Sequence, residues 1–369
     1  MKRDIPQLHA IRALAMAAIF FHHLWQGSGA LRRGYAGTLL DTAFLDMALG
    51  VVVFNAMTAF LMGLPYCGDQ PLATPAPGPA IRKRLWRLYP QYALAVVGFT
   101  GLSVAVFRLT DFGGVCWGMV SHLLFLDTFQ VSPFYGNMAA FWWLGLLVQF
   151  TVVFPWLARW MLRPGWGPAG CFLVSAAILW PLTGWIQARG AALPGTSFET
   201  FAFLWTFNLP ARLPEFCCGL WLAKAWHDHG GPGWPFGRGV AVFLGGACLF
   251  TWVWGQVPGA PPLGHMTGAI WSVAVFAAFF ALPGMAALGR LRAVMRVSTL
   301  SYGIYLAHQP LLSFGGPATA GLDPWTRFVV LTLGAGTASL MAAWLLERGA
   351  AWLTERLRPH LQAGKSALS

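Results

Sequence analysis

The run FVVLTLGAGTASLMAAWLL, residues 328–346, contains no charged side chain. A helix needs about 20 apolar residues, at ~1.5 Å of rise per residue, to cross the ~30 Å hydrocarbon core of a bilayer. This run therefore predicts a membrane-spanning helix. Similar apolar runs occupy residues 13–25, 43–65, 88–107, 139–158, 169–187, 199–226, 239–254, 270–289 and 298–315. The sequence thus predicts an all-α fold, a polytopic bundle of about ten transmembrane helices.

The composition argues against a soluble globular protein. Hydrophobic residues make up 57% of the 369-residue chain and charged residues only 10%, whereas soluble domains carry about 25% charged residues. No polar linker divides the sequence, so we expect one membrane-embedded domain, residues 1–355, and a short basic tail, residues 356–369. The net charge of +12 is typical of the positive-inside rule, so we expect membrane lipids and no nucleic acid as partners. The six cysteines form no C-x-x-C pair, and we expect no metal.

The basic residues predict which loops face the cytoplasm, because short cytoplasmic loops are enriched in lysine and arginine. With the N-terminus inside and the first span retained, the dense basic cluster at 82–87 is also cytoplasmic. If residues 112–130 crossed the membrane, every later basic cluster would lie outside. We therefore expect 112–130 to be a re-entrant segment and both termini to be cytoplasmic. Such a segment needs protein or a cavity to cover its backbone, so it is a candidate wall of a substrate site.

Ionisable residues within spans are costly to bury and are therefore candidate functional residues. Arg12 and His23 are eleven residues apart. At 100° per residue both face the same side of a helix, ~16 Å apart along its axis, whereas His22 points ~100° away. The alternative interpretation is a snorkelling arginine near the interface and a histidine that bonds a carbonyl elsewhere.

A second candidate site is the segment IRKRLWRLYP, residues 81–90. Arg84 and Arg87 share a helix face, and their planar guanidinium groups suit a phosphate; the same residues can also serve only as a cytoplasmic anchor. Arg212 and Glu215 are three residues apart and are either a structural ion pair or part of a site. The remaining ionisable candidates are Asp46, His122, Asp127, His308 and Glu347.

Five segments, in order along residues 5–310, resemble landmarks of membrane acyltransferase family 3. They are the Arg12–His23 spacing in LHAIRALAMAAIFFHHLW, the arginine pair of RKRLWRLYP, QFTVVFP at 149–155, RLPEFCCG at 212–219 and SYGIYLAHQP at 301–310. Each landmark is weak alone, but five in order are a specific signature. The last one contains Ser301, Tyr302 and His308, and His308 lies about ten residues into its span, near mid-membrane.

The resemblance implies an integral-membrane O-acyltransferase in the cytoplasmic membrane of a bacterium. It implies transfer of an acyl group, usually acetyl, from cytoplasmic acyl-CoA to a hydroxyl of a cell-surface or exported carbohydrate or glycoconjugate. Arg12, Arg84 and Arg87 would then hold the donor, and His23 would be the catalytic residue. A histidine titrates near neutral pH and suits a general base; a covalent acyl-histidine is the alternative.

The chain also departs from the family pattern. Val52 stands where the family's Gly-Val-Asp-x-Phe-Phe run has its aspartate, and Asn55 replaces the second phenylalanine, which indicates a divergent branch. Asp46 and Glu215 are two unranked candidates for the group that fixes the tautomer of His23. A transporter or flippase, with buried Arg, His and Glu in its substrate path, is the alternative function.

Overall fold

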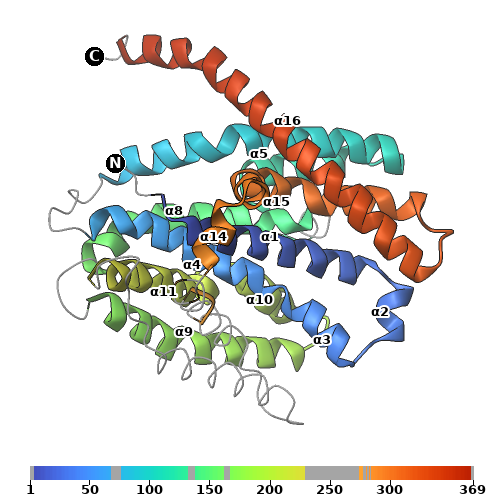
Figure 1. Ribbon diagram of the computed structural model, residues 1–369, viewed down its shortest axis with the longest axis horizontal. Coiled ribbons are helices and arrows are strands. Elements are labelled where there is room, and N and C mark those ends of the chain that lie inside the picture. Colours follow the sequence, from blue (N-terminus) through green and yellow to red (C-terminus); the bar gives the residue numbers. More distant parts are fainter. Residues whose placement is uncertain are drawn as a thin grey trace.

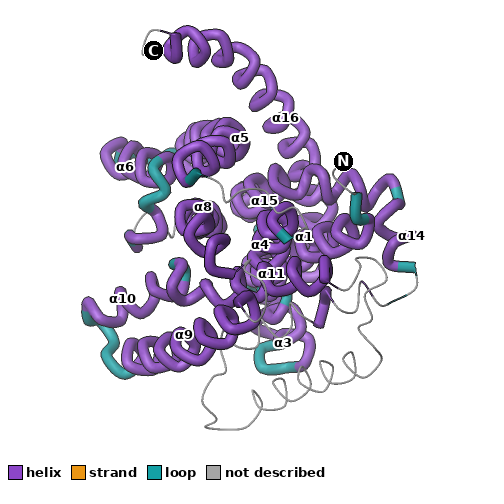
Figure 2. Tube along the Cα trace, turned by 90° about the vertical axis from the view of Figure 1, so that its left-hand side faces the viewer, coloured by secondary structure: helices purple, strands orange, loops and turns teal. Residues whose placement is uncertain are grey.

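The computed structural model describes residues 4–67, 76–131, 138–161, 167–228, 274–276, 280, 282 and 284–366. Within these ranges the chain forms helices joined by loops and contains no strand (Figure 2). The α-helices are α1 Pro6–Gly27, α2 Ala30–Gly34, α3 Leu39–Asp46, α4 Leu49–Gly63, α5 Pro77–Phe107, α6 Phe112–Leu123, α8 Trp142–Met161, α9 Gly167–Ala191, α10 Ser197–Thr206, α11 Leu209–Asp228, α14 Met285–Arg290, α15 Arg292–Ala318 and α16 Pro324–Ser366. Three short 3-10 helices are η1 Leu64–Tyr66, η2 Asp127–Phe129 and η3 Ala139–Phe141. The predicted all-α fold is confirmed for this part of the chain.

Six helices of the described ranges are long and apolar enough to cross a membrane. They cover Pro6–Gly27, Leu39–Tyr66, Pro77–Phe107, Ala139–Arg159, Gly170–Ala191 and Pro324–Leu357. The helices α11 and α15 have the length of a span but are more polar. The predicted span at 239–254, and most of the one at 270–289, lie outside the described residues. The described part of the chain therefore holds six candidate membrane spans by length and composition, and the count of about ten stays a prediction.

The prediction of one continuous span over 199–226 is wrong, because two helices, α10 and α11, meet at Phe207 and Asn208. The amide of Asn208 donates to the carbonyl of Leu204 (2.7 Å) and to that of Thr128 on a distant segment (2.9 Å). An asparagine side chain that bonds main-chain carbonyls competes with helix continuation. Phe207 at this break and Arg212 in the first turn of α11 both line the cavity described below.

Helices α3 and α4 run antiparallel to α1. The ring of Phe44 stacks on Trp25 near the end of α1, with centroids 4.6 Å apart. Gly50, further along, packs against the middle of α1. A Cβ atom at Gly50 would lie 2.6 Å from the carbonyl oxygen of Ala15, so only glycine allows this approach.

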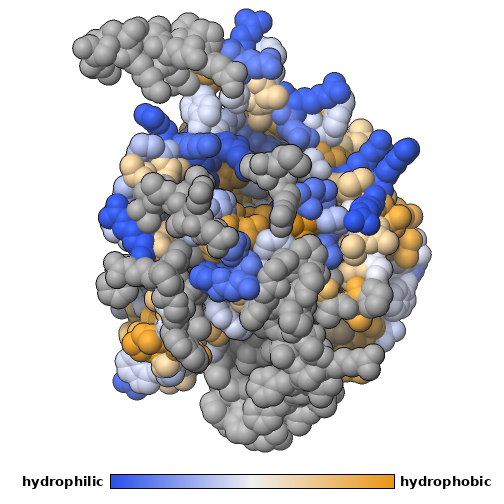
Figure 3. Space-filling model, turned by 60° about the vertical axis from the view of Figure 1, so that its left-hand side comes forward, coloured by the Kyte–Doolittle hydropathy of each residue, from blue (hydrophilic) through white to orange (hydrophobic). Residues whose placement is uncertain are grey.

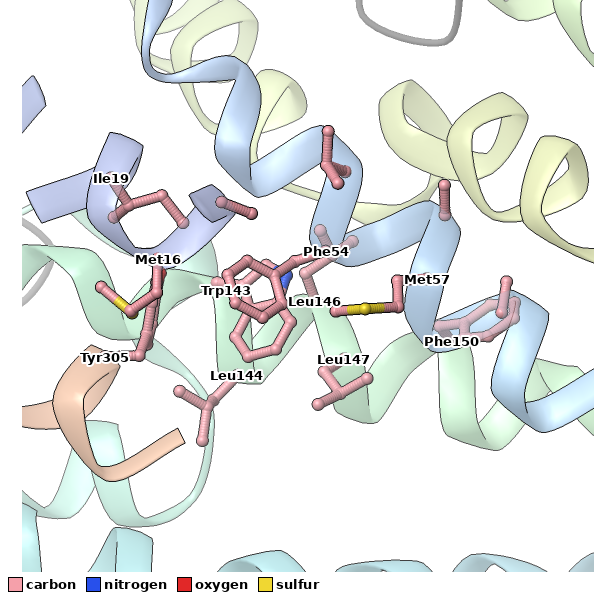
Figure 4. Close-up of a cluster of buried hydrophobic side chains, with 14 of the residues drawn as sticks. Met16, Ile19, Phe54, Met57, Trp143, Leu144, Leu146, Leu147, Phe150 and Tyr305 are labelled. Atoms are coloured by element: carbon pink, nitrogen blue, oxygen red, sulfur yellow. The ribbon is translucent and has the colours of Figure 1, made fainter. Parts of the chain in front are cut away.

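Helix α8 runs parallel to α4. Phe54 contacts Trp143 near the start of both helices, and Tyr66 contacts Phe154 near their ends. Side chains of α1, α4, α8 and α15 interdigitate here to form the hydrophobic core (Figure 4). The core is therefore built by helices that run in both directions.

Helix α5 runs parallel to α15, because Tyr302 donates a hydrogen bond to the carbonyl of Leu88 and Phe314 contacts Phe99. Helix α15 in turn runs parallel to α1. Helices α5 and α8 therefore point in opposite directions, so α5 ends and α8 begins toward the same end of the bundle. Between them lies α6, which has 12 residues and a length of ~18 Å, too short to cross a bilayer.

The start of α1 and the C-terminal end of α16 lie toward the same side of the bundle, at the left in Figure 1. Seen partly from that side, the surface carries several hydrophilic patches among hydrophobic ones (Figure 3). Helix α16 spans 43 residues, or ~64 Å at 1.5 Å per residue, and its last turns project beyond the other helices (Figure 1).

Candidate functional site

A cavity of about 560 Å³ opens where α1, α3, α4, α11 and α15 converge. Much of its lining is apolar or aromatic and comes from α4, the start of α8 and the α10–α11 junction. Its polar lining residues are His22, His23, Gln26, Asp46, Arg212, Tyr305 and Gln309. A concave apolar pocket with a few convergent polar groups is the usual form of a small-molecule site.

Three histidines meet beside this cavity. The ring of His23 lies between the other two, with its centroid 5.1 Å from that of His22 and 5.2 Å from that of His308. His22 and His23 line the cavity, whereas His308 is fully buried. Within the described ranges, no group of three or more His, Cys, Asp and Glu side chains is arranged to hold a metal ion.

The two outer histidines are fixed by main-chain carbonyls. Nδ1 of His22 lies 3.3 Å from the carbonyl oxygen of Phe44, and Nδ1 of His308 lies 2.7 Å from that of Tyr305. A carbonyl only accepts, so each Nδ1 carries a proton and each neutral ring presents Nε2 as an acceptor. His23 instead hydrogen-bonds the Gln26 side chain. His23 is thus the ring of the three whose nitrogens are not assigned by the main chain.

Arg212 forms one wall of the cavity. Its Nη1 pairs with the carboxylate of Glu215 at 3.0 Å, and its Nε donates to the carbonyl of Thr206 at 2.9 Å. The guanidinium also lies over the ring of Trp142, 5.5 Å from its centroid. Arg212 is therefore held from three sides while it remains part of the cavity surface.

Glu215 lies behind Arg212 and is fully buried. Its second oxygen accepts a 2.6 Å hydrogen bond from Asn55, whose own oxygen accepts from the indole of Trp143 at 2.7 Å. Glu215 does not line the cavity as Arg212 does. Its carboxylate thus links α11 to α4 through Asn55, and Asn55 in turn links α4 to Trp143 of α8.

Asp46 is the acidic residue that lines the cavity, at the end of α3. Val52, at the position of the family's aspartate, lines the same cavity. The carboxylate at this cavity is therefore that of Asp46, the last residue of α3, whereas the first turn of α4 carries the apolar Val52.

A second cluster consists of Arg12, Arg84 and Arg87. Arg12 and Arg84 each interact electrostatically with Arg87, so α1 and α5 bring three like charges together. No ion pair to any of the three is found among the described residues. Nε of Arg84 is buried and makes no hydrogen bond there. Such an arrangement favours an anion, because like charges repel until a counter-charge binds.

Two residues of the last landmark lie elsewhere. The hydroxyl of Ser301 donates to the carbonyl of Ser298 within α15 (2.8 Å), and that of Tyr302 donates to the carbonyl of Leu88 on α5 (3.1 Å). Neither lines the cavity. The Tyr302 bond fastens α15, which carries His308, to α5, whereas the Ser301 bond stays within α15.

The other ionisable candidates also lie away from the cavity. His122 and Asp127 form a fully buried pair, Nδ1 to Oδ2 at 3.4 Å, at the end of α6. Glu347 borders a separate hollow of about 760 Å³ between α15 and α16, together with Arg292 and Arg296.

Tyr305 and Gln309 were not singled out from the sequence. The Gln309 side chain accepts from the amide of Ala140 at 2.5 Å, and the Tyr305 hydroxyl donates to the carbonyl of the same residue. His308 and Gln309 follow Tyr305 by three and four residues, so both lie one helical turn after it. That helical spacing within SYGIYLAHQP was the available signal.

A family model described as an acyltransferase domain matches residues 5–348. No curated protein and no solved structure matches the chain. The family match covers most of the sequence and includes every landmark that the resemblance identified. The chain belongs to acyltransferase family 3 and is a membrane acyltransferase.

Proposed function

We propose that this protein transfers an acyl group from cytoplasmic acyl-CoA to a hydroxyl, and that the acyl group is acetyl. The acceptor is a cell-surface or exported carbohydrate or glycoconjugate. His23 is the catalytic residue, and Arg12, Arg84 and Arg87 bind the phosphates of the donor. One observation carries the proposal: a single uninterrupted helix, α1, presents His23 to a cavity and Arg12 to the arginine cluster, to which the described residues offer no ion pair.

The spacing of these two features fits the shape of acyl-CoA. The arginine cluster and His23 are ~16 Å apart along α1. CoA carries its phosphates at one end and its thioester at the end of a long flexible arm. Charge-assisted bonds from guanidinium groups would hold the phosphates, while the arm extends along the bundle to the cavity.

The reaction proposed for the cavity is a direct transfer. His23 accepts the proton of the acceptor hydroxyl as the oxygen attacks the thioester carbonyl. The tetrahedral intermediate then collapses, the carbon–sulfur bond breaks, and the thiolate takes the proton from His23. The products are the ester and CoA with a free thiol, so no other reactant is needed. The N–H groups of Arg212 lie in the same cavity and could bind the developing oxyanion.

The acceptor enters the same cavity in this proposal. Asp46, Arg212 and Gln309 supply charged and amide groups that can bind sugar hydroxyls, and Trp142 and Phe207 supply aromatic surface. Pockets of this kind use a few polar groups to orient a ligand against apolar walls.

We also propose that the chain lies in the cell membrane with both termini in the cytoplasm, and that residues 112–130 re-enter without crossing. The short length of α6 supports this, as do the opposite directions of α5 and α8. The arginine cluster would then face the cytoplasmic pool of acyl-CoA, while His23 lies deeper toward the outer side.

The test uses purified protein in lipid nanodiscs with acetyl-CoA and a thiol reagent that detects released CoA. Wild-type protein should release CoA, slowly by hydrolysis without acceptor and faster with an extract of cell-surface glycans. His23→Ala should abolish release while donor binding persists. Absence of release by folded wild-type protein with any acyl-CoA and acceptor would refute the proposed function.

A further inference from the structure

We propose that His308, and not a carboxylate, fixes the tautomer and orientation of His23. This inference rests on the proposed role of His23 and assigns a positioning residue to it. His308 lies on α15, far from His23 in sequence, and its ring centroid is 5.2 Å from that of His23, with the ring planes tilted by 46°.

Neither of the two carboxylates that could fix the tautomer of His23 is bonded to it in the described part of the chain. Glu215 is bound by Arg212 and Asn55, at 3.0 and 2.6 Å, and does not line the cavity. Asp46 lines the cavity, but no hydrogen bond or ion pair joins it to His23 within the described part of the chain. The last turn of α3, which carries Asp46, contacts His22 through the carbonyl of Phe44.

His308 has one nitrogen committed and one available. Its Nδ1 donates to the carbonyl of Tyr305 at 2.7 Å, which makes Nε2 a lone-pair acceptor. Nε2 is buried and has no hydrogen-bond partner among the described residues, and the His308 side chain is fully inaccessible. A buried acceptor of this kind is nearly always paired in a folded protein. The neighbouring ring that carries an N–H is His23.

A hydrogen bond from His23 to Nε2 of His308 would determine which nitrogen of His23 is the base. The nitrogen that donates to His308 keeps its proton. The other nitrogen is then unprotonated and is the one beside Gln26, which lines the cavity where the acceptor hydroxyl binds. As His23 takes up a proton during transfer, the same bond holds the imidazolium in place. A histidine thus does here what a carboxylate does in many catalytic pairs, without a buried negative charge.

The Tyr305 side chain adds rigidity to this arrangement. Its hydroxyl donates to the carbonyl of Ala140, and its ring lies 5.5 Å from that of His308. The carbonyl that fixes His308 is therefore on a turn of α15 that is itself fastened to the start of α8. The positioning chain runs from Ala140 through Tyr305 and His308 to His23.

The first experiment compares His308→Leu with His308→Gln, whose Oε1 can still accept a hydrogen bond. We expect His308→Leu to lower kcat by about 10- to 100-fold with the donor KM and CoA affinity unchanged. His308→Gln should recover a substantial part of this loss. Equal losses in both variants, with equal thermal stability, would overturn the role of the acceptor. Asp46→Asn is the competing variant, and a larger kcat loss there than in His308→Leu would assign the role to the carboxylate.

A second readout does not depend on activity. Histidine labelled at its ring nitrogens reports the tautomer of each ring by NMR in bilayers, and a His23→Gln sample identifies the His23 signals. We expect one tautomer of His23 in the wild type and a mixture of both in His308→Leu. An unchanged His23 spectrum in His308→Leu would overturn the inference, even if the protein proved to have another reaction. If the wild-type protein shows no acyl transfer, the proposed function is refuted, but the tautomer measurement still tests the role of His308.

Discussion

Asn55 donates a hydrogen bond of 2.6 Å to the buried carboxylate of Glu215 and joins the middle of α4 to α11. The two helices touch closely enough for this bond because Gly219 faces Ala56. A Cβ atom at Gly219 would lie 2.1 Å from the carbonyl oxygen of Ala56. The residue that departs from the family pattern at 55 is therefore built into this junction through its amide.

Asn55→Leu should lower the thermal stability of the protein. The substitution keeps a similar volume but removes one hydrogen bond from Glu215 and one from the indole of Trp143. Loss of a partner for a buried polar group costs about 1–3 kcal/mol. Thermal unfolding in detergent, followed by tryptophan fluorescence, measures the effect. Thr58→Val, one turn further along α4, is the matched control, and an equal Tm for both variants would contradict the prediction.

His23→Ala should abolish acyl transfer, and His22→Ala should retain much of it. Removal of a general base costs about 10²–10⁴ in rate. His22 lines the same cavity, but its Nδ1 is bound to the carbonyl of Phe44, so it serves the α1–α3 contact. Release of CoA by both purified variants, with CoA binding as the folding control, is the measurement. Greater loss in His22→Ala would assign the chemistry to that ring.

Arg84→Gln and Arg87→Gln should weaken donor binding. Each charge-assisted bond to a phosphate contributes about 1.5–3 kcal/mol, so each variant should raise the dissociation constant of CoA roughly 10- to 100-fold. Titration of CoA into purified protein measures this. Arg82→Gln and Lys83→Gln, exposed residues of the same helix, are controls for charge alone. The donor site is elsewhere if all four variants bind CoA equally.

A cysteine introduced next to Arg159 should be labelled only from the cytoplasm. The prediction follows from the positive-inside rule and from the opposite directions of α5 and α8. In a cysteine-free background of intact cells, an impermeant maleimide should reach Ser197→Cys, in the predicted outer loop, but not a cysteine beside Arg159. Labelling from outside beside Arg159, but not at Ser197→Cys, would mean that residues 112–130 cross the membrane.

Long apolar runs made the helices predictable, because a run near 20 residues without charge has few alternatives to a span. The break between α10 and α11 was not predictable. It depends on Asn208, whose amide reaches Thr128, and on Gln149, whose side chain accepts from the amide of Leu209. These partners are far apart in the sequence and come together only in the folded protein, so no local sequence pattern predicts the break.

Some residues of the candidate site could likewise be predicted from the sequence, and others could not. Charged residues within apolar runs pointed to Asp46 and Arg212, and the family spacing pointed to His23; the structure gathers all three at one cavity. Tyr305 and Gln309 were not among the candidates, because the criterion within apolar runs was a side chain that is charged or titrates near neutral pH. Burying an uncharged side chain in a span costs much less free energy, so such residues do not stand out in the sequence. The sequence also left the partner of His23 open, since the choice depends on which carboxylates are occupied by other groups.

The length of α16 has a practical consequence. If residues 328–346 cross the bilayer, the residues from Glu347 to Ser366 extend the same helix by roughly 30 Å. The last turns stand clear of the other helices (Figure 1), and Arg348 and Arg356 each lie over a tryptophan of the same helix. The end of this helix is therefore a suitable place to attach a fluorescent protein or an affinity tag. A tag joined after Ser366 would lie away from the bundle and would leave both the cavity and the arginine cluster unobstructed.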